Sequence, residues 1–329
     1  MNNYSEAAPA GKNDLLSVSN LTRSGFFELL ALSRDLRSRV MFADALQGKS
    51  VALIFEKPSL RTRVTFEVAI RQLGGWPVLL PESRLGEREA VPDVARSLSQ
   101  WVDAIVARVF SHQALEELAV FSSVPVVNAL SDYEHPCQAL ADVLTLADIW
   151  PDFGGKEVVY VGDWNNVSRS LERACRLAGL GFRAVCPEGY GPHGGEQVEW
   201  SANTDTVEGA DAIYTDVWAS MGQEHELAER LKVFEPYQVN EKLLARTGKR
   251  TFFMHCLPAH RGQEVDDLVI ESEDSLVFRQ AANRLPVEKA VLFSLLENHY
   301  EASEEGRAGI FRRTGHIDHH SMAQRKLWV

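Results

Sequence analysis

The stretch Ser50-Val51-Ala52-Leu53-Ile54-Phe55-Glu56-Lys57-Pro58-Ser59-Leu60-Arg61-Thr62-Arg63 decides the fold. Its first six residues form a nearly uninterrupted apolar run, which is typical of a strand buried on both faces of a parallel sheet. Residues 61–73 follow with helical spacing, because Phe66 and Ile70 fall on one face, and Gly74-Gly75 ends the helix. A strand, a polar turn and a helix in this order indicate an α/β domain.

The same unit recurs along the chain and starts afresh after a glycine-containing break at residues 151–155. The sequence predicts further strands at 104–109, 124–127, 157–161, 182–186, 212–215 and 252–255, a weaker strand at 276–278, and helices at 91–102, 137–150, 167–178 and 282–300. We therefore expect an α/β fold with two domains, each a parallel sheet with helices on both faces, and an active site in the interdomain cleft. The expected domains are residues 1–150 and 151–329, with the last helix, from about residue 283, packing back on the first.

Length, charge and cysteine content restrict the class of protein. The 329 residues suit two domains of ordinary size. The net charge of −12 argues against nucleic acid or an anionic membrane as a partner, because the averaged field repels phosphate polymers. The four cysteines form no CxxC pair, so we expect no metal site and reduced thiols, as in a cytoplasmic protein. A secretory signal is not expected, because the N-terminal residues lack a basic region followed by an apolar run. A membrane span is not expected either, since no apolar run approaches roughly 18–20 residues.

Residues 56–63 place a polar, cationic segment between the buried strand and the start of a helix. Free backbone amides and the helix dipole favour an anion at such a position. Ser59 and Thr62 add hydroxyl donors, and the guanidinium groups of Arg61 and Arg63 can bind phosphate oxygens in pairs. A helix cap with two solvated arginines explains the segment by itself equally well.

Further polar segments follow other predicted strands or open predicted helices. They contain Arg108, His135 with Gln138, Asp216, His255 with Cys256, and Arg284. Each has an ordinary structural interpretation: a surface arginine, a hydrogen-bonding histidine, a helix-capping aspartate or a buried, inert cysteine. Nearly all of them share one position, the C-terminal ends of strands, where open α/β sheets bind ligands. This shared position favours a binding site.

Four segments resemble, in sequence and order, the motifs of the aspartate/ornithine carbamoyltransferase family: Ser59-Leu60-Arg61-Thr62-Arg63, His135-Pro136-Cys137-Gln138, Asp216-Val217-Trp218-Ala219-Ser220-Met221-Gly222 and His255-Cys256-Leu257-Pro258. The first two, with Arg108, are similar to the carbamoyl-phosphate site that the family shares. The last two are similar to its ornithine-using members. The resemblance covers residues 16–300.

The resemblance implies a role for each matching residue. Carbamoyl phosphate would be bound by Ser59, Leu60, Arg61, Thr62, Arg108, His135, Gln138, Cys256, Leu257 and Arg284, and ornithine by Asn166, Asp216, Ser220 and Met221. The catalytic residues would be Arg61, Thr62, Arg108, His135, Asp216 and Cys256. Thr62, Arg108 and His135 would polarise the carbonyl oxygen. The family also implies a homotrimer, no metal and no organic cofactor.

The implied reaction transfers the carbamoyl group of carbamoyl phosphate to the side-chain amine of L-ornithine, giving L-citrulline and phosphate in cytoplasmic arginine biosynthesis. Three features depart from the family pattern: Trp164 stands where glycine is usual, Arg84 where glutamine or histidine is common, and the segment 188–208 is shorter. The alternatives are a carbamoyltransferase for an acylated ornithine or putrescine, a non-catalytic paralogue, and a nucleotide-binding oxidoreductase. The last lacks a G-x-G-x-x-G motif after its strand at residue 158.

Overall fold

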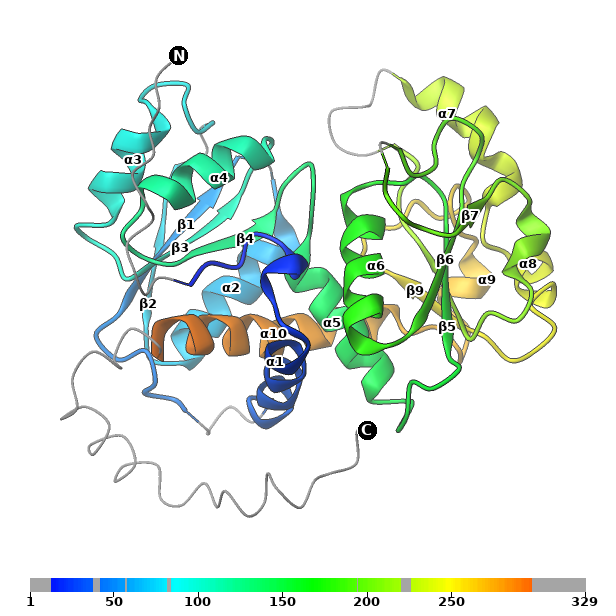
Figure 1. Ribbon diagram of the computed structural model, residues 1–329, viewed down its shortest axis with the longest axis horizontal. Helices are drawn as coiled ribbons and strands as arrows, with labels where there is room; N and C mark the ends of the chain where they lie inside the picture. Colours follow the sequence, from blue (N-terminus) through cyan, green and yellow to red (C-terminus); the bar gives the residue numbers. More distant parts are fainter. Residues whose placement is uncertain are drawn as a thin grey trace.

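The computed structural model describes residues 13–37, 42–56, 58–81, 84–193, 195–219 and 226–297. Within these residues the strands form two separate sheets, one in each half of the chain (Figure 1). Every strand pair is parallel, and helices cover both faces of each sheet, so the expected fold class is confirmed. None of the described helices combines the length and the apolarity needed to cross a membrane.

The first sheet has the strand order β2-β1-β3-β4. Its elements are β1 (Ser50–Phe55), β2 (Trp76–Leu79), β3 (Ala104–Arg108), β4 (Val126–Leu130), α1 (Arg23–Asp35), α2 (Leu60–Gln72), α3 (Val91–Leu98), α4 (His112–Phe121), α5 (Pro136–Ala147) and the short 3₁₀ helix η1 (Val18–Asn20). Successive side chains of β1 point to opposite faces, so Val51 and Leu53 join one core while Ala52 and Ile54 join another. Helices α3 and α4 cover the second of these faces, and α2 and α5 the first.

The second sheet has the strand order β7-β6-β5-β8-β9. Its elements are β5 (Glu157–Val161), β6 (Gly181–Val185), β7 (Trp200–Ser201), β8 (Ala212–Thr215), β9 (Phe252–His255), α6 (Asn166–Ala178), α7 (Leu227–Phe234), α8 (Glu241–Ala245), α9 (Asp267–Ile270) and the 3₁₀ helices η2 (Thr204–Val207) and η4 (Glu235–Tyr237). Helix α6 packs against α5 of the first half. One hydrophobic core therefore runs from the first sheet through α5 and α6 to the second.

The C-terminal helix α10 (Val277–Glu297) returns to the first sheet and packs against α1, α2 and α5 (Figure 1). It begins earlier than the predicted start at residue 282. The strand predicted at 276–278 is wrong, because Ser275 makes only an isolated bridge to Phe253 and Val277 already opens the helix. Apolar, β-prone residues favoured a strand there, and packing overrode that local preference.

Several elements were not predicted from the sequence. They include the helices α1, α4, α7, α8 and α9 and two of the edge strands, β2 and β7. Strand β2 contains Pro77, and proline is tolerated in a sheet only where its missing donor is not needed, as at an edge. An edge strand of four residues with a proline carries little periodicity, which explains why the sequence pattern does not reveal it.

Candidate active site

A cavity of about 1070 Å³ lies where the C-terminal ends of strands from both sheets meet. Its lining comes from the segments after β1, β3 and β4 of the first sheet, from those after β5, β6, β8 and β9 of the second, and from α7 and α10. The predicted site residues that line it are Ser59, Leu60, Arg61, Thr62, Arg108, His135, Gln138, Asn166, Asp216, Cys256, Leu257 and Arg284. Ser220 and Met221 lie outside the described residues. Segments separated by more than two hundred residues in sequence are thus brought to one site.

The start of α2 supplies the cationic end of the cavity. Ser59 is the N-cap residue in extended backbone, and its side chain accepts no capping hydrogen bond from the described part of the chain. The first amides of a helix have no partner within the helix, so they and the Ser59 hydroxyl can bind an anion. Arg61 follows in the first turn and lines the cavity, whereas Arg63 is absent from its described lining.

Three guanidinium groups, those of Arg61, Arg108 and Arg284, gather at this end. Burial, together with the neighbouring charge of Arg284, lowers the pKa of Arg61 and brings the pKa of Arg108 to about 10. Both stay protonated at neutral pH. Among the described residues, the Arg108 Nε–H is buried without a partner, while its Nη1 donates to the Thr62 hydroxyl at 3.4 Å. Mutual repulsion and an unpaired donor indicate a site built for an anion.

Arg284 of α10 connects the cationic end of the cavity to α2 and α5 through hydrogen bonds. Its Nη1 donates to Gln138 Oε1 at 2.7 Å, and its Nη2 donates to the Thr62 hydroxyl at 3.2 Å. Burial lowers the pKa of Arg284, but the adjacent Glu288 carboxylate more than offsets this and raises the pKa overall. Arg284 therefore remains a charged, donor-only group at the junction of α2, α5 and α10.

His135 precedes α5 and is only 5% exposed. Its backbone N–H donates to Ser170 Oγ at 2.8 Å, and its ring Nδ1 is buried without a hydrogen-bond partner in the described part of the chain. Burial and the charges of Arg284 and Arg108 hold the imidazole pKa well below its usual value. The ring is therefore neutral at pH 7, with one N–H donor and one acceptor.

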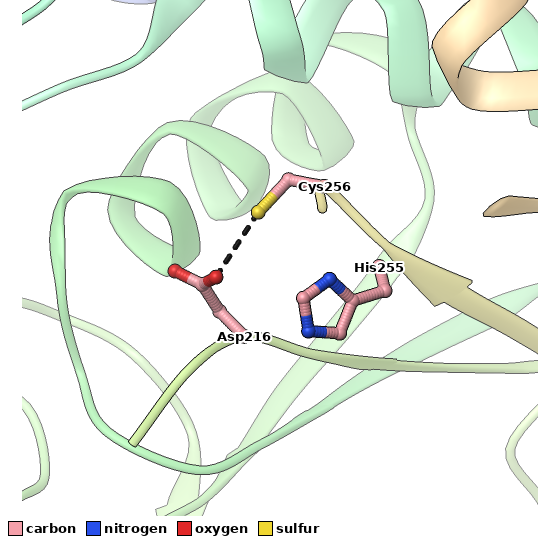
Figure 2. A group of neighbouring side chains, drawn as sticks. All are labelled: Asp216, His255 and Cys256. Atoms are coloured by element: carbon pink, nitrogen blue, oxygen red, sulfur yellow. Dashed lines mark hydrogen bonds between the residues drawn. The ribbon is translucent and has the colours of Figure 1, made fainter. Parts of the chain in front are cut away.

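Asp216 and Cys256 meet at the ends of β8 and β9 (Figure 2). The Cys256 thiol donates to Asp216 Oδ1 at 3.1 Å, and the Asn165 amide donates to Asp216 Oδ2 at 2.9 Å. Burial, and then the Asp216 charge, raise the pKa of Cys256 well above its ordinary value. Cys256 is therefore a neutral thiol near pH 7, and Asp216 supplies the negative charge at this end of the cavity.

His255 lies beside Asp216 and Cys256 in Figure 2, and the candidate ligand atoms of the three lie within 4.8 Å of one another. Such a group can hold a metal ion when its lone pairs are free. Here the His255 Nδ1 accepts from the Leu257 N–H at 2.8 Å, and its Nε2 faces Glu264 Oε1 at 3.3 Å. The Nδ1 lone pair is therefore used to hold the loop in which Leu257 has a φ of +58°, while Nε2 is buried without a hydrogen-bond partner among the described residues.

Asn166 and Trp164 lie on the loop between β5 and α6. The Asn166 side-chain amide donates to the Ser131 carbonyl oxygen at 2.6 Å, which joins this loop to the segment after β4. Trp164 is 8% exposed, and its indole N–H donates to Glu196 Oε2 at 2.6 Å. The indole thus bonds the loop between β5 and α6 to a carboxylate of the segment between β6 and β7.

Arg230 and Asp163 are cavity residues that sequence reasoning missed. The Arg230 Nη1 donates to Asp163 Oδ2 at 2.7 Å and to the Trp218 carbonyl oxygen at 2.9 Å, so it links the loop after β5 to the loop after β8. Asp163 adjoins the loop that carries Asn166, a position that could have identified it. Arg230 sits on α7 within a helix that has no motif, so no local signal pointed to it.

The other departure, Arg84, contacts the Phe110 ring, with its guanidinium carbon 4.4 Å from the ring centroid. Phe110 lines the cavity, whereas Arg84 is not part of the described lining. Arg84 is therefore an exposed residue that packs on a cavity-lining ring but does not itself line the described cavity of one chain.

Fold and site together define a two-domain α/β protein with a cluster of arginines on one side of the cavity and a carboxylate–thiol pair on the other. Residues 13–148 match the model of the aspartate/ornithine carbamoyltransferase carbamoyl-P binding domain, and residues 154–295 match that of the Asp/Orn binding domain. The chain belongs to the aspartate/ornithine carbamoyltransferase family.

Proteins of known name within the family are similar to this chain to different degrees. Ornithine carbamoyltransferase from Shewanella oneidensis is 46% identical over 296 residues, which cover 85% of this chain and 98% of the relative. The crystal structure of ornithine carbamoyltransferase from Thermus thermophilus has a TM-score of 0.80 at 44% identity, covering 86% of this chain and 98% of that one. An N-acetyl-L-ornithine transcarbamylase is also similar, at 29% identity and a TM-score of 0.77, covering 86% and 99%.

Proposed function

We infer that this chain transfers the carbamoyl group of carbamoyl phosphate to the side-chain amine of L-ornithine, giving L-citrulline and phosphate. The observation that carries the inference is one cavity joining the cationic start of α2 to the Asp216–Cys256 pair. Relatives that are 43–48% identical and named ornithine carbamoyltransferase support this substrate pair. We assign carbamoyl phosphate to residues 1–150 with the helix from about 283, and ornithine to residues 151–329.

Carbamoyl phosphate is proposed to bind at the cationic end. Its phosphate accepts hydrogen bonds from the start of α2 and from Arg61 and Arg108, whose mutual repulsion an anion relieves. Thr62, Arg108 and His135 donate to the carbonyl oxygen and stabilise the negative charge that develops on it. The depressed pKa of His135 keeps the ring neutral at pH 7, so it offers one N–H donor without adding a further positive charge to the site.

Ornithine is proposed to bind at the other end. Its side-chain amine has a pKa of roughly 10.4, like that of lysine, so the amine arrives protonated and is attracted to the Asp216 carboxylate. The protonated Cys256 thiol orients that carboxylate through its 3.1 Å hydrogen bond. Asn166, with Ser220 and Met221, contacts the rest of the amino acid in this assignment.

The reaction follows from this placement. The ammonium group gives one proton to the Asp216 carboxylate, and the neutral nitrogen attacks the carbonyl carbon to form a C–N bond. The tetrahedral intermediate collapses, and the bond from carbon to the phosphate oxygen breaks. The departing phosphate takes one of the two protons then on the nitrogen, which keeps the other as the ureido N–H. No metal or organic cofactor enters this sequence, because the phosphate is already an activated leaving group. Closing the cavity around both substrates excludes water.

A panel of amines tests the proposed acceptor. Purified protein is given carbamoyl phosphate with L-ornithine, N-acetyl-L-ornithine or putrescine, and ureido product is measured. We expect citrulline from ornithine and at most trace product from the other two amines. Product only from an acylated ornithine or from putrescine would show that the acceptor is wrong. Product from none of them would support a non-catalytic paralogue.

We also propose that the protein works as a cytoplasmic homotrimer in arginine biosynthesis. The family match supports the assembly, as does the edge strand β2, whose Trp76 is 65% exposed. We expect sedimentation equilibrium to give three times the 36.7 kDa mass of the chain, and a monomer at micromolar concentration would contradict the proposal.

A further inference from the structure

Asp142 is a fully buried carboxylate directly behind the cavity, and it accepts three hydrogen bonds. Its Oδ1 accepts from the side-chain amides of Gln138 and Gln280, each at 2.8 Å, and its Oδ2 accepts from the Tyr214 hydroxyl at 3.0 Å. Asp142 itself is absent from the described cavity lining, whereas Gln138, one helical turn earlier on α5, lines the cavity. Any effect of Asp142 on a ligand must therefore pass through its neighbours.

The three bonds determine which way the Gln138 amide points. An ionised carboxylate only accepts, so Gln138 must turn its NH₂ group toward Asp142. On its other side, Arg284 only donates, and its Nη1 lies 2.7 Å from Gln138 Oε1. An acceptor-only group and a donor-only group thus hold the amide from opposite sides. A rotation of 180° would set NH₂ against guanidinium and carbonyl against carboxylate.

This orientation has a chemical consequence at the cavity. A carbonyl oxygen has two lone pairs, so Gln138 Oε1 can accept from a ligand while it accepts from Arg284. A carbamoyl group presents an NH₂ donor at that point, whereas the methyl group of an acetyl phosphate presents none. A site built to bond a donor strongly rejects the analogue that lacks it, since the buried acceptor then loses a partner.

We propose that Asp142 is a positioning and specificity-determining residue, which holds the Gln138 carbonyl oxygen toward the substrate so that the site selects carbamoyl phosphate over other acyl phosphates. The inference rests on the proposed function, since it takes carbamoyl phosphate as the ligand.

A purely structural role for Asp142 is the competing explanation. Tyr214 belongs to β8 and Asp142 to α5, so their bond also links the two domains. Gln280 extends that link, because its Oε1 accepts from the His255 N–H at 3.0 Å. The two explanations differ in one respect: a structural role affects every ligand and the stability alike, whereas a positioning role affects the carbamoyl group through Gln138.

The first variant is Asp142→Asn, which keeps the shape of the side chain. It replaces one acceptor oxygen with an NH₂ group, which then faces donors that the carboxylate had accepted from. We expect the KM for carbamoyl phosphate to rise about 10- to 100-fold, as for a lost hydrogen bond with a buried partner left unpaired. The inhibition constant of acetyl phosphate and the KM for ornithine should change by less than about threefold on the same argument. Asp142→Ser removes the same constraint with a smaller side chain and is the second variant if Asp142→Asn does not fold.

Two further variants separate positioning from stability. Tyr214→Phe removes another bond to the same carboxylate, so we expect it to lower the melting temperature and leave discrimination between carbamoyl and acetyl phosphate unchanged. In a Gln138→Ala background, Asp142→Asn should have no further effect on the KM for carbamoyl phosphate. Additive effects, or equal losses for carbamoyl and acetyl phosphate, would overturn the proposal. Wild-type citrulline formation is measured first, so that failure of the proposed function is seen separately.

Discussion

Replacement of Arg61 by alanine is expected to lower kcat/KM for carbamoyl phosphate by about a thousandfold, the loss seen when a donor to the developing transition-state charge is removed. Arg61 lines the cavity in the first turn of α2, where its partly buried guanidinium faces the charges of Arg108 and Arg284. Three like charges are stable together when an anion neutralises them, so removing one weakens both phosphate binding and catalysis. Initial velocities at saturating ornithine measure the effect.

Arg71→Ala is the matched control for this prediction. Arg71 lies at the far end of the same helix, where its 55% exposed side chain pairs with Glu67. An exposed pair of this kind contributes little, so the control should retain wild-type kinetics. If Arg61→Ala kept more than about a tenth of wild-type kcat/KM, the assignment of the start of α2 as the anion site would be refuted.

Replacement of Asp216 by alanine is expected to act on the other substrate. We expect kcat/KM for ornithine to fall by about two to three orders of magnitude, the range for loss of one strong electrostatic contact at the reacting group. Asp216 carries the charge that attracts the protonated amine, while the raised pKa of Cys256 leaves the thiol unable to replace it at neutral pH. Carbamoyl phosphate affinity, measured by calorimetry, should change by less than about threefold because Asp216 is not among the residues assigned to that substrate.

Two further variants test whether the charge of Asp216 is the property that matters. Asp216→Asn keeps an acceptor for the Cys256 thiol but removes the charge, so a loss close to that of alanine would identify charge as the essential property. Asp205→Asn removes a carboxylate on the same domain whose side chain is 74% exposed, and should leave ornithine kinetics unchanged. An Asp216→Ala protein with normal ornithine kinetics but weakened carbamoyl phosphate binding would reverse the assignment of the two ends.

The parts of the fold that the sequence could predict are those where local patterns carry the information. The buried run at 50–55 and the helical period after it identify β1 and α2, because burial on both faces leaves a continuous apolar segment. Strand β2 and the start of α10 could not be found this way. The first is a short edge with a proline, and the second depends on packing between segments distant in the chain.

The same distinction between local patterns and tertiary packing applies to the residues of the site. Arg61, His135, Asp216 and Cys256 follow strands or open helices, so their positions could be predicted to converge. Asp142 could not be predicted, because its partners Tyr214 and Gln280 come from β8 and α10 and only the tertiary structure brings them together. The residues proposed to touch substrate lie mostly in motifs, whereas those proposed to orient them are dispersed over helices and a strand.

The most direct test of the account is to follow the bond that the reaction forms. Carbamoyl phosphate labelled with ¹³C at its carbonyl carbon and L-ornithine labelled with ¹⁵N at its side-chain nitrogen are incubated with the wild-type protein and observed by NMR. We expect a ureido carbon with one-bond coupling to that nitrogen, in citrulline. A ureido carbon that shows no coupling to ¹⁵N, or ¹³C released only as carbonate, would contradict it.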